Sequence, residues 1–208
     1  MFLKFLRKLV NKQIAKERVF SKRFAYSISF EKTKINWYSS GAMNAYAATG
    51  GTDMAFFTEP PEDKDKWGAM LTTYIVDAGE EIYSELELNL TKLFGALQSD
   101  MEKKIVEEDE FLRPRLIKIM EATHGRDDSK WTLDEKSLKR LPSKSFYGLV
   151  MIGKIKSETK QNYTTFDVVA PIGKQLLIVG ALMPENPDTT VLNDVISIGE
   201  SLVVKLQK

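Results

Sequence analysis

The 208-residue chain contains no cysteine and a single histidine, and both scarcities exclude classes of protein. Without cysteine it can form no disulfide, no thiolate nucleophile and no zinc site of the cysteine type. One histidine cannot build a histidine-rich metal centre, so we expect no metal site. Apolar runs stay below the ~18 residues of a membrane-spanning helix. With 43% apolar and 28% charged residues, we expect one globular domain of α/β type.

The net charge of +1 is the sum of two opposite parts. Residues 1–26 carry eight basic residues and one acidic residue, a charge of +7, and residues 27–208 therefore carry −6. Apolar residues recur in the first segment at steps of three and four, which predicts a basic amphipathic helix. We therefore divide the chain into a leader or arm, 1–26, and a single domain, 27–208. The residues expected to form the membrane or targeting helix are Phe2, Leu3, Lys4, Phe5, Leu6, Arg7, Lys8 and Leu9.

Three functions compete for this leader. Organellar targeting peptides are amphipathic, basic and poor in acidic residues. A permanent helix on an anionic membrane surface has the same residue types, because its apolar face enters the acyl chains while lysines meet the head groups. A terminal arm that docks on the protein's own body, or on an acidic partner, is the third. Lysines interrupt every apolar stretch, so a secretory signal is excluded.

Strand-like stretches precede the first long helix. Residues 24–30, 53–58 and 67–76 are rich in aromatic and β-branched residues, and residues 32–37 turn into a further short strand. Residues 80–105 are expected to be helical because apolar residues follow steps of three and four. That stripe consists of Ile82, Leu86, Leu90, Leu93, Leu97, Met101 and Ile105.

The second half of the chain predicts a further set of strands and a closing helix. Pro114 is expected to end the helical region and to permit a strand over residues 115–122. A polar stretch over residues 124–140 offers Thr132 or Asp134 as the cap of a short helix. Strands follow at residues 145–156, 163–170 and 174–183, and the almost wholly apolar third one should lie in the middle of the sheet. Asp188 can cap a last helix, in which Gly199 indicates close packing.

The resulting order is strands, long helix, strand, meander and closing helix, which predicts a mainly antiparallel sheet flanked by helices. In this order the chain resembles the PsbP-like superfamily, which includes PsbP, Ran guanine-nucleotide release factors and DcrB-type lipoproteins. The resemblance covers residues 24–205. It rests on the aromatic strand 24–30, Trp37, Phe56, Phe57, Pro60, the strand 71–76, the helix from Ile82, the strand 176–183, and the closing helix 196–203 with Ser201.

The resemblance implies an α/β/α sandwich and a role without catalysis or cofactor. Members assist larger complexes, so the resemblance implies an interaction or assembly subunit of a larger, membrane-associated organellar complex, with protein partners. The lysine-rich leader favours a mitochondrial location, with a cytoplasmic, membrane-peripheral protein as the alternative. A small-molecule or lipid carrier, with a pocket between the sheet and helix 80–105, is the second functional class.

Several kinds of chemistry fit the residues poorly. His124 with Asp127 and Asp128 could form an acid–base or metal site, but such a polar cluster is more typical of a solvated turn. Ser39 or Ser40 with His124 would supply a hydrolase triad by residue type, yet the Gly-x-Ser-x-Gly pattern is missing. The acidic body excludes nucleic acid as a partner.

Protein contacts are expected at two loops, residues 39–52 and 124–140, because long polar loops on a rigid scaffold are common recognition surfaces. Aromatic residues there could anchor a partner, although each could equally belong to the core. The candidate partner-binding residues are Trp37, Tyr38, Trp131, His124 and Arg126.

Overall fold

The computed structural model describes most of the body of the chain. The described residues are 11–40, 52–58, 68–77, 101–125, 128–141, 143, 146–157, 161–172 and 175–204. The predicted leader helix at residues 2–9, residues 80–100 of the helix predicted over 80–105, and Arg126 lie outside this part of the chain. No helix in the described part is long and apolar enough to cross a membrane.

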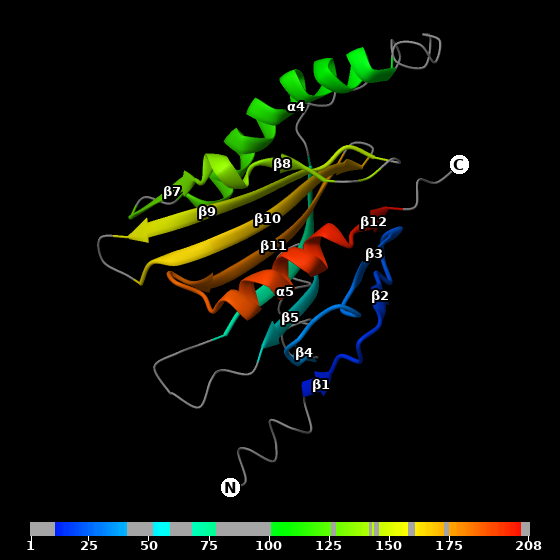
Figure 1. Cartoon of the computed structure of the whole chain (residues 1–208), viewed down its shortest axis with the longest axis vertical. Coiled ribbons are helices and arrows are strands. Elements are labelled where there is room, and N and C mark those ends of the chain that lie inside the picture. The colour runs from blue at the N-terminus through cyan, green and yellow to red at the C-terminus, as the bar shows by residue number, and fades with distance from the viewer. Residues whose placement is uncertain are drawn as a thin grey trace, which may run out of the picture.

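Two antiparallel sheets form the framework (Figure 1). In spatial order, the large sheet contains β1 (Asn11–Gln13), β4 (Trp37–Ser40), β5 (Thr52–Thr58), β6 (Met70–Asp77), β11 (Gln175–Pro184), β10 (Tyr163–Ile172), β9 (Leu149–Ser157) and β7 (Ser129–Leu133), with β8 (Lys139–Arg140) also paired to β9. The small sheet contains β12 (Val203–Val204), β3 (Tyr26–Ser29) and β2 (Arg18–Phe20).

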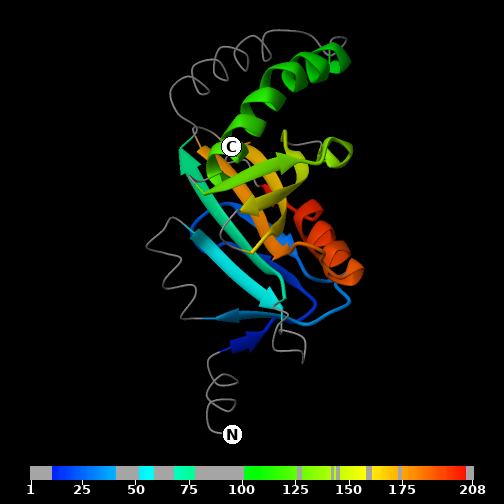
Figure 2. The ribbon, with the colours of Figure 1, turned by 90° about the vertical axis from the view of Figure 1, so that its left-hand side faces the viewer.

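One long helix lies on each face of the large sheet, so the protein is an α/β/α sandwich. Helix α4 (Met101–His124) covers one face and α5 (Thr189–Glu200) the other (Figures 1 and 2). A 3-10 turn, η2 (Glu135–Ser137), is capped by Asp134, and α5 is capped by Asp188, whose carboxylate accepts a 2.7 Å bond from the Thr190 amide. Both caps agree with the sequence prediction.

Strand β11 lies in the middle of the large sheet, as its apolar sequence predicted. It pairs with β6 on one side and β10 on the other. Because successive side chains of a strand point to opposite faces, Leu177 and Val179 pack in the core beneath α5, whereas Leu176 and Ile178 pack in the core beneath α4. Alternate side chains of this one strand therefore pack in the two hydrophobic cores of the sandwich.

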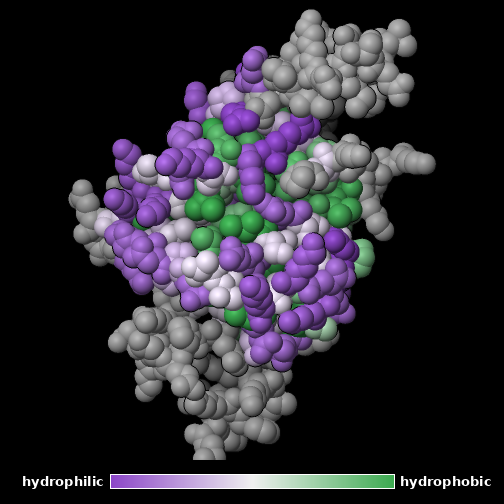
Figure 3. All heavy atoms as spheres, viewed as in Figure 1, coloured by the Kyte–Doolittle hydropathy of each residue, from purple (hydrophilic) through white to green (hydrophobic). Residues whose placement is uncertain are grey.

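Polar side chains cover most of the face seen in Figure 3, and hydrophobic side chains reach the surface mainly near its centre. Among the described residues, two large hydrophobic side chains are exposed, Phe20 at 57% and Val203 at 43%. In the small sheet, Phe20 on β2 and Val203 on β12 both pair with Ser27, which lies between them on β3.

Of the leader, residues 1–26, the structure describes residues 11–26, which contain no helix. Residues 11–13 and 18–20 are the strands β1 and β2, which pair with β4 and β3. Arg18 donates hydrogen bonds from Nη1 to the Ser27 hydroxyl and to the Ser201 carbonyl. Strand pairing satisfies the backbone groups of these residues, and the two hydrogen bonds fix the Arg18 guanidinium on the body of the protein. Residues 11–20 thus pair with the body of the protein.

The strand predicted over residues 115–122 is wrong, because α4 continues through Pro114 to His124. Leu112, Leu116 and Met120 recur at steps of four and are at most 2% exposed, packed against the sheet. An interior proline costs a helix about 3 kcal/mol. Burying three such side chains contributes about 1.5–3 kcal/mol each, which outweighs that cost. Pro114 itself lies on the exposed side of the helix.

Candidate functional site

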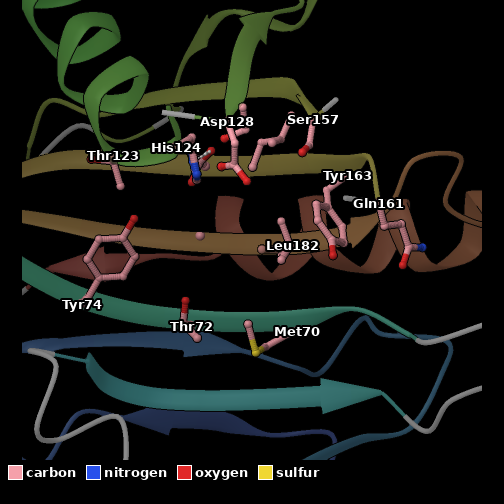
Figure 4. A pocket seen from close by; sticks show the side chains of 15 residues that line it. Met70, Thr72, Tyr74, Thr123, His124, Asp128, Ser157, Gln161, Tyr163 and Leu182 are labelled. Atoms are coloured by element: carbon pink, nitrogen blue, oxygen red, sulfur yellow. Dashed lines mark hydrogen bonds and ion pairs between the residues drawn. The ribbon is translucent and has the colours of Figure 1, made fainter. Parts of the chain in front are cut away.

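The last turn of α4 places Thr123 and His124 over the uncovered end of one sheet face. Opposite them, β6, β11, β10 and β9 present the side chains that point toward α4 (Figure 4). Alternation along β6 directs Met70, Thr72 and Tyr74 to this face, whereas Leu71 belongs to the core under α5. The site is therefore built between the end of a helix and a sheet.

A His–Asp pair lies at the centre of this site. Nε2 of His124 lies 2.9 Å from Oδ2 of Asp167, although the two residues are 43 positions apart. Asp167 is fully buried, and the His124 side chain is 16% exposed. Because a carboxylate only accepts hydrogen bonds, Nε2 of the ring is the donor. This hydrogen bond is the only one that the His124 side chain makes within the described part of the chain.

Trp131 holds the imidazole of His124 in place. The two rings stack, with centroids 5.8 Å apart and an interplanar angle of 26°. The indole is itself fixed by a 2.9 Å hydrogen bond from Nε1 to the Thr165 hydroxyl. Trp131 is 5% exposed, so this support belongs to the core under α4. The orientation of His124 is thus set by packing as well as by Asp167.

The second carboxylate oxygen of Asp167 has no hydrogen-bond partner among the described residues. It faces Gly180, where an added Cβ would lie 3.0 Å from Oδ1 and 3.8 Å from the Tyr74 hydroxyl. A side chain at Gly180 would therefore crowd the Asp167 carboxylate. Burial, and secondly the charge of Asp167, raises the pKa of Tyr74, so its hydroxyl stays protonated at neutral pH.

His124, Asp167, Gly180 and Tyr74 all line one pocket of about 490 Å³. Figure 4 shows His124 and Asp128 on one side of it, with Thr72 and Tyr74 across from them. The volume is within the ~300–1,000 Å³ range typical of small-molecule sites. The lining residues are Met70, Thr72, Tyr74, Thr123, His124, Asp128, Ser129, Ile155, Ser157, Gln161, Tyr163, Asp167, Gly180, Ala181 and Leu182.

Among the described residues that line the pocket, Asp128 and Asp167 carry carboxylates and none is lysine or arginine. Lys154 and Lys156 on the neighbouring strand β9 alternate with the pocket residues Ile155 and Ser157. They therefore point to the opposite face of the sheet. In the described part of the chain, no group of three histidine, aspartate or glutamate residues could hold a metal ion.

The structure separates the predicted partner-binding residues. Trp37 is 1% exposed and packs in the core under α5, and Trp131 lies in the other core, so neither offers an exposed anchor here. Tyr38 stacks on Phe57, with ring centroids 5.9 Å apart. His124 is the one described member of the set that lines the pocket.

The triad considered from residue types does not form. Ser39 lies on β4, which is four strand positions away from β10 and Asp167 in the sheet. At about 4.8 Å per strand, this separates them by roughly 19 Å. His124 pairs with Asp167, which the sequence analysis did not single out. The available signal was an acidic residue inside the otherwise apolar and β-branched strand 163–170.

No protein-family model and no curated protein sequence matches the chain. Among solved structures, the fold is similar to the solution structure of cyanobacterial PsbP (CyanoP) from Synechocystis sp. PCC 6803. The likeness covers 94% of this chain and 93% of that one, at 13% sequence identity and a TM-score of 0.48.

Proposed function

We propose that this chain is a non-enzymatic accessory protein that binds a small ligand in the His124–Asp167 pocket. The observation that carries the proposal is the pocket itself, whose lining includes Asp167 with a fully buried oxygen, Oδ1, that has no hydrogen-bond partner in the described structure. An unsatisfied buried polar group costs about 1–3 kcal/mol, and more when it is charged. A bound donor group recovers that cost.

The arrangement supports binding better than catalysis. A hydrolase of the triad type needs a nucleophile within about 2.6–3.2 Å of its base. In the described part of the chain, no hydroxyl is hydrogen-bonded to His124, and Nε2 is occupied by Asp167. The pair therefore serves to fix the position of the Asp167 carboxylate at the pocket.

The test is an NMR titration of the isotope-labelled chain with a fragment library that contains cationic, neutral and anionic compounds. Bound compounds should shift the amide signals of pocket residues on β6, β10 and β11. Leu182→Trp should block them, because Leu182 projects into the pocket (Figure 4). Lys154→Trp, on the opposite face of the sheet, is the matched control. The proposal fails if no compound of any class moves the pocket signals at millimolar concentration.

A role as a subunit of a larger complex is the second candidate. It is favoured by the exposed Phe20 and Val203, which lie opposite Ser27 in the small sheet. Fixed apolar side chains of this kind can anchor a protein partner. Co-purification from the native source should recover the partner with the wild-type chain and lose it with a Phe20→Ser/Val203→Ser double variant. Equal recovery with both chains would contradict this role.

The mitochondrial or membrane-peripheral location is proposed from the basic leader. The intact mass of the native protein is the direct test. A mass that lacks about the first two dozen residues would indicate a cleaved targeting peptide. A full-length mass would favour a permanent membrane or protein contact by the leader.

A further inference from the structure

We infer that the turn between β2 and β3 contacts the surface of an anionic bilayer. In this contact Phe20 and Val203 face the acyl chains. Lys22 and Arg23 face the lipid phosphates. The contact is separate from the ligand pocket and goes beyond the proposed function. It is carried by the face of the small sheet on which the two apolar residues lie, by the shape of the turn and by the charges around it.

Phe20 and Val203 lie on the same face of the small sheet. Each pairs with Ser27, from opposite sides, and directly paired residues of neighbouring strands share a face. Tyr26 and Ile28, which flank Ser27 along β3, belong to the hydrophobic core, so the shared face points away from the body of the protein. Phe20 is 57% exposed and Val203 is 43% exposed. The small sheet therefore carries two apolar side chains on its outer face, with only the short Ser27 between them.

The turn that follows β2 holds two basic side chains close to Phe20 in the sequence. The Ser21 hydroxyl accepts hydrogen bonds of 3.1 and 2.9 Å from the amides of Arg23 and Phe24, a pattern that fixes the backbone of a turn. Lys22 and Arg23 are both exposed. The guanidinium carbon of Arg23 lies 5.3 Å from the centroid of the Phe24 ring. One hydrogen-bonded hairpin (Figure 1) therefore presents apolar and cationic side chains together.

The charge around the turn is positive. Neither Lys22 nor Arg23 forms an ion pair with another described residue. The acidic residues nearest to them in the sequence, Glu17 and Glu31, flank the opposite end of the hairpin. Residues 205–208, which follow β12, contain two lysines and no acidic residue. An anionic surface is therefore the complementary partner.

The combination of exposed apolar and basic side chains favours a bilayer over other anionic partners. At an anionic bilayer, apolar side chains enter the boundary between head groups and acyl chains, and lysine or arginine meets the phosphates. A nucleic acid would use the two charges and leave Val203 without an apolar contact. An acidic protein would need a shaped apolar pocket for each of Phe20 and Val203. A lipid surface accommodates both kinds of side chain without such a pocket.

The test is co-sedimentation of the full chain with vesicles of phosphatidylcholine alone and with vesicles of phosphatidylcholine and phosphatidylserine in equal parts. Each basic residue near an anionic bilayer strengthens binding about fivefold. Lys22→Gln/Arg23→Gln should therefore weaken binding to the anionic vesicles about thirtyfold. Phe20→Ser/Val203→Ser should weaken it about tenfold, because the two apolar contacts with lipid are lost.

Two variants with the same loss of charge are the controls. Lys154→Gln/Lys156→Gln removes two exposed lysines from β9 in the large sheet, so its binding should stay within about twofold of the wild type. Lys4→Gln/Lys8→Gln removes two lysines of the leader, which has the same residue types. If this leader variant loses binding while the turn variant keeps it, the leader alone contacts the membrane and the inference is overturned.

The inference is also overturned if phosphatidylserine does not strengthen binding. A third contrary result would come from Phe20→Ser/Val203→Ser. If this variant loses a co-purifying protein but binds anionic vesicles like the wild type, the apolar pair belongs to a protein interface. None of these outcomes depends on the ligand titration that tests the pocket, so the inference and the proposed ligand binding can fail separately.

Discussion

The indole of Trp131 occupies the space that a side chain at Gly153 would fill. A Cβ built on Gly153 would lie 2.2 Å from Nε1 of Trp131 and 2.4 Å from Cε2, well inside contact distance. The same indole supports the imidazole of His124. The glycine on β9 is thus linked through one aromatic ring to the candidate site.

Gly153→Ala should therefore displace Trp131 and destabilise the protein. Overpacking of a core site costs typically about 1–3 kcal/mol, so the free energy of unfolding should fall by that amount. Denaturant unfolding, followed by tryptophan fluorescence, measures it. Lys154→Ala, at the exposed neighbouring position on β9, should change stability by less than about 0.5 kcal/mol. A Gly153→Ala protein as stable as the wild type would contradict the packing described here.

Gly199 makes a comparable close contact on the other face of the sheet. A Cβ there would lie 2.3 Å from Cε1 of Phe166 and 3.0 Å from Cγ2 of Val168. Alanine improves helix propensity by about 1 kcal/mol. The overlap with a fully buried ring should outweigh that gain and lower the free energy of unfolding by about 1 kcal/mol or more.

The control is a double-mutant cycle with Phe166→Leu, which shortens the side chain that Gly199 accommodates. The cost of Gly199→Ala should be smaller in that background, because the residues are in contact and their effects are not additive. Equal costs in the two backgrounds would mean that the strain lies elsewhere.

The sequence allowed the strands and the closing helix to be predicted where one local pattern determines them. The apolar run of β11 indicated a central strand, and Asp188 and Asp134 indicated the two caps. The prediction that Pro114 ends the helical region was wrong. The poor helix propensity of proline is outweighed by a tertiary effect, the burial of Leu112, Leu116 and Met120 against the sheet. Strand β7 was missed because Trp131 is its only buried residue.

The candidate site was only half predictable. His124 stood out as the single histidine, but its partner Asp167 is 43 residues away and lies on another element. No spacing rule connects the end of a helix to the middle of a strand. Only the order of strands in the sheet, which brings β10 beneath the last turn of α4, joins them.

Leu116→Ala tests whether residues 115–122 belong to α4. Leu116 is fully buried in the core under this helix, so its truncation should lower the free energy of unfolding by about 2–5 kcal/mol. Lys118→Ala is the control, because position 118 lies on the exposed side of the helix. In a strand, residues 116 and 118 would share one face, and the two substitutions would not differ in this way.

Tyr74 should make the protein sensitive to alkaline pH. Burial, followed by the charge of Asp167, raises the pKa of its hydroxyl in the folded state above its ordinary value of about 10. Below that pH both the folded and the unfolded chain keep the proton, and the stabilisation is fully present. As the pH rises above about 10, the unfolded chain releases the proton while the folded chain retains it, so stability falls.

Tyr74→Phe removes this group while keeping its ring. The variant should unfold with a free energy close to that of the wild type at pH 7, since the hydroxyl forms no hydrogen bond with another described residue. Denaturant unfolding between pH 8 and about 11 should show a shallower loss of stability in the variant than in the wild type. Parallel losses in the two proteins would mean that Tyr74 releases its proton equally readily in the folded and unfolded chains. That result would contradict the buried position of its hydroxyl beside Asp167.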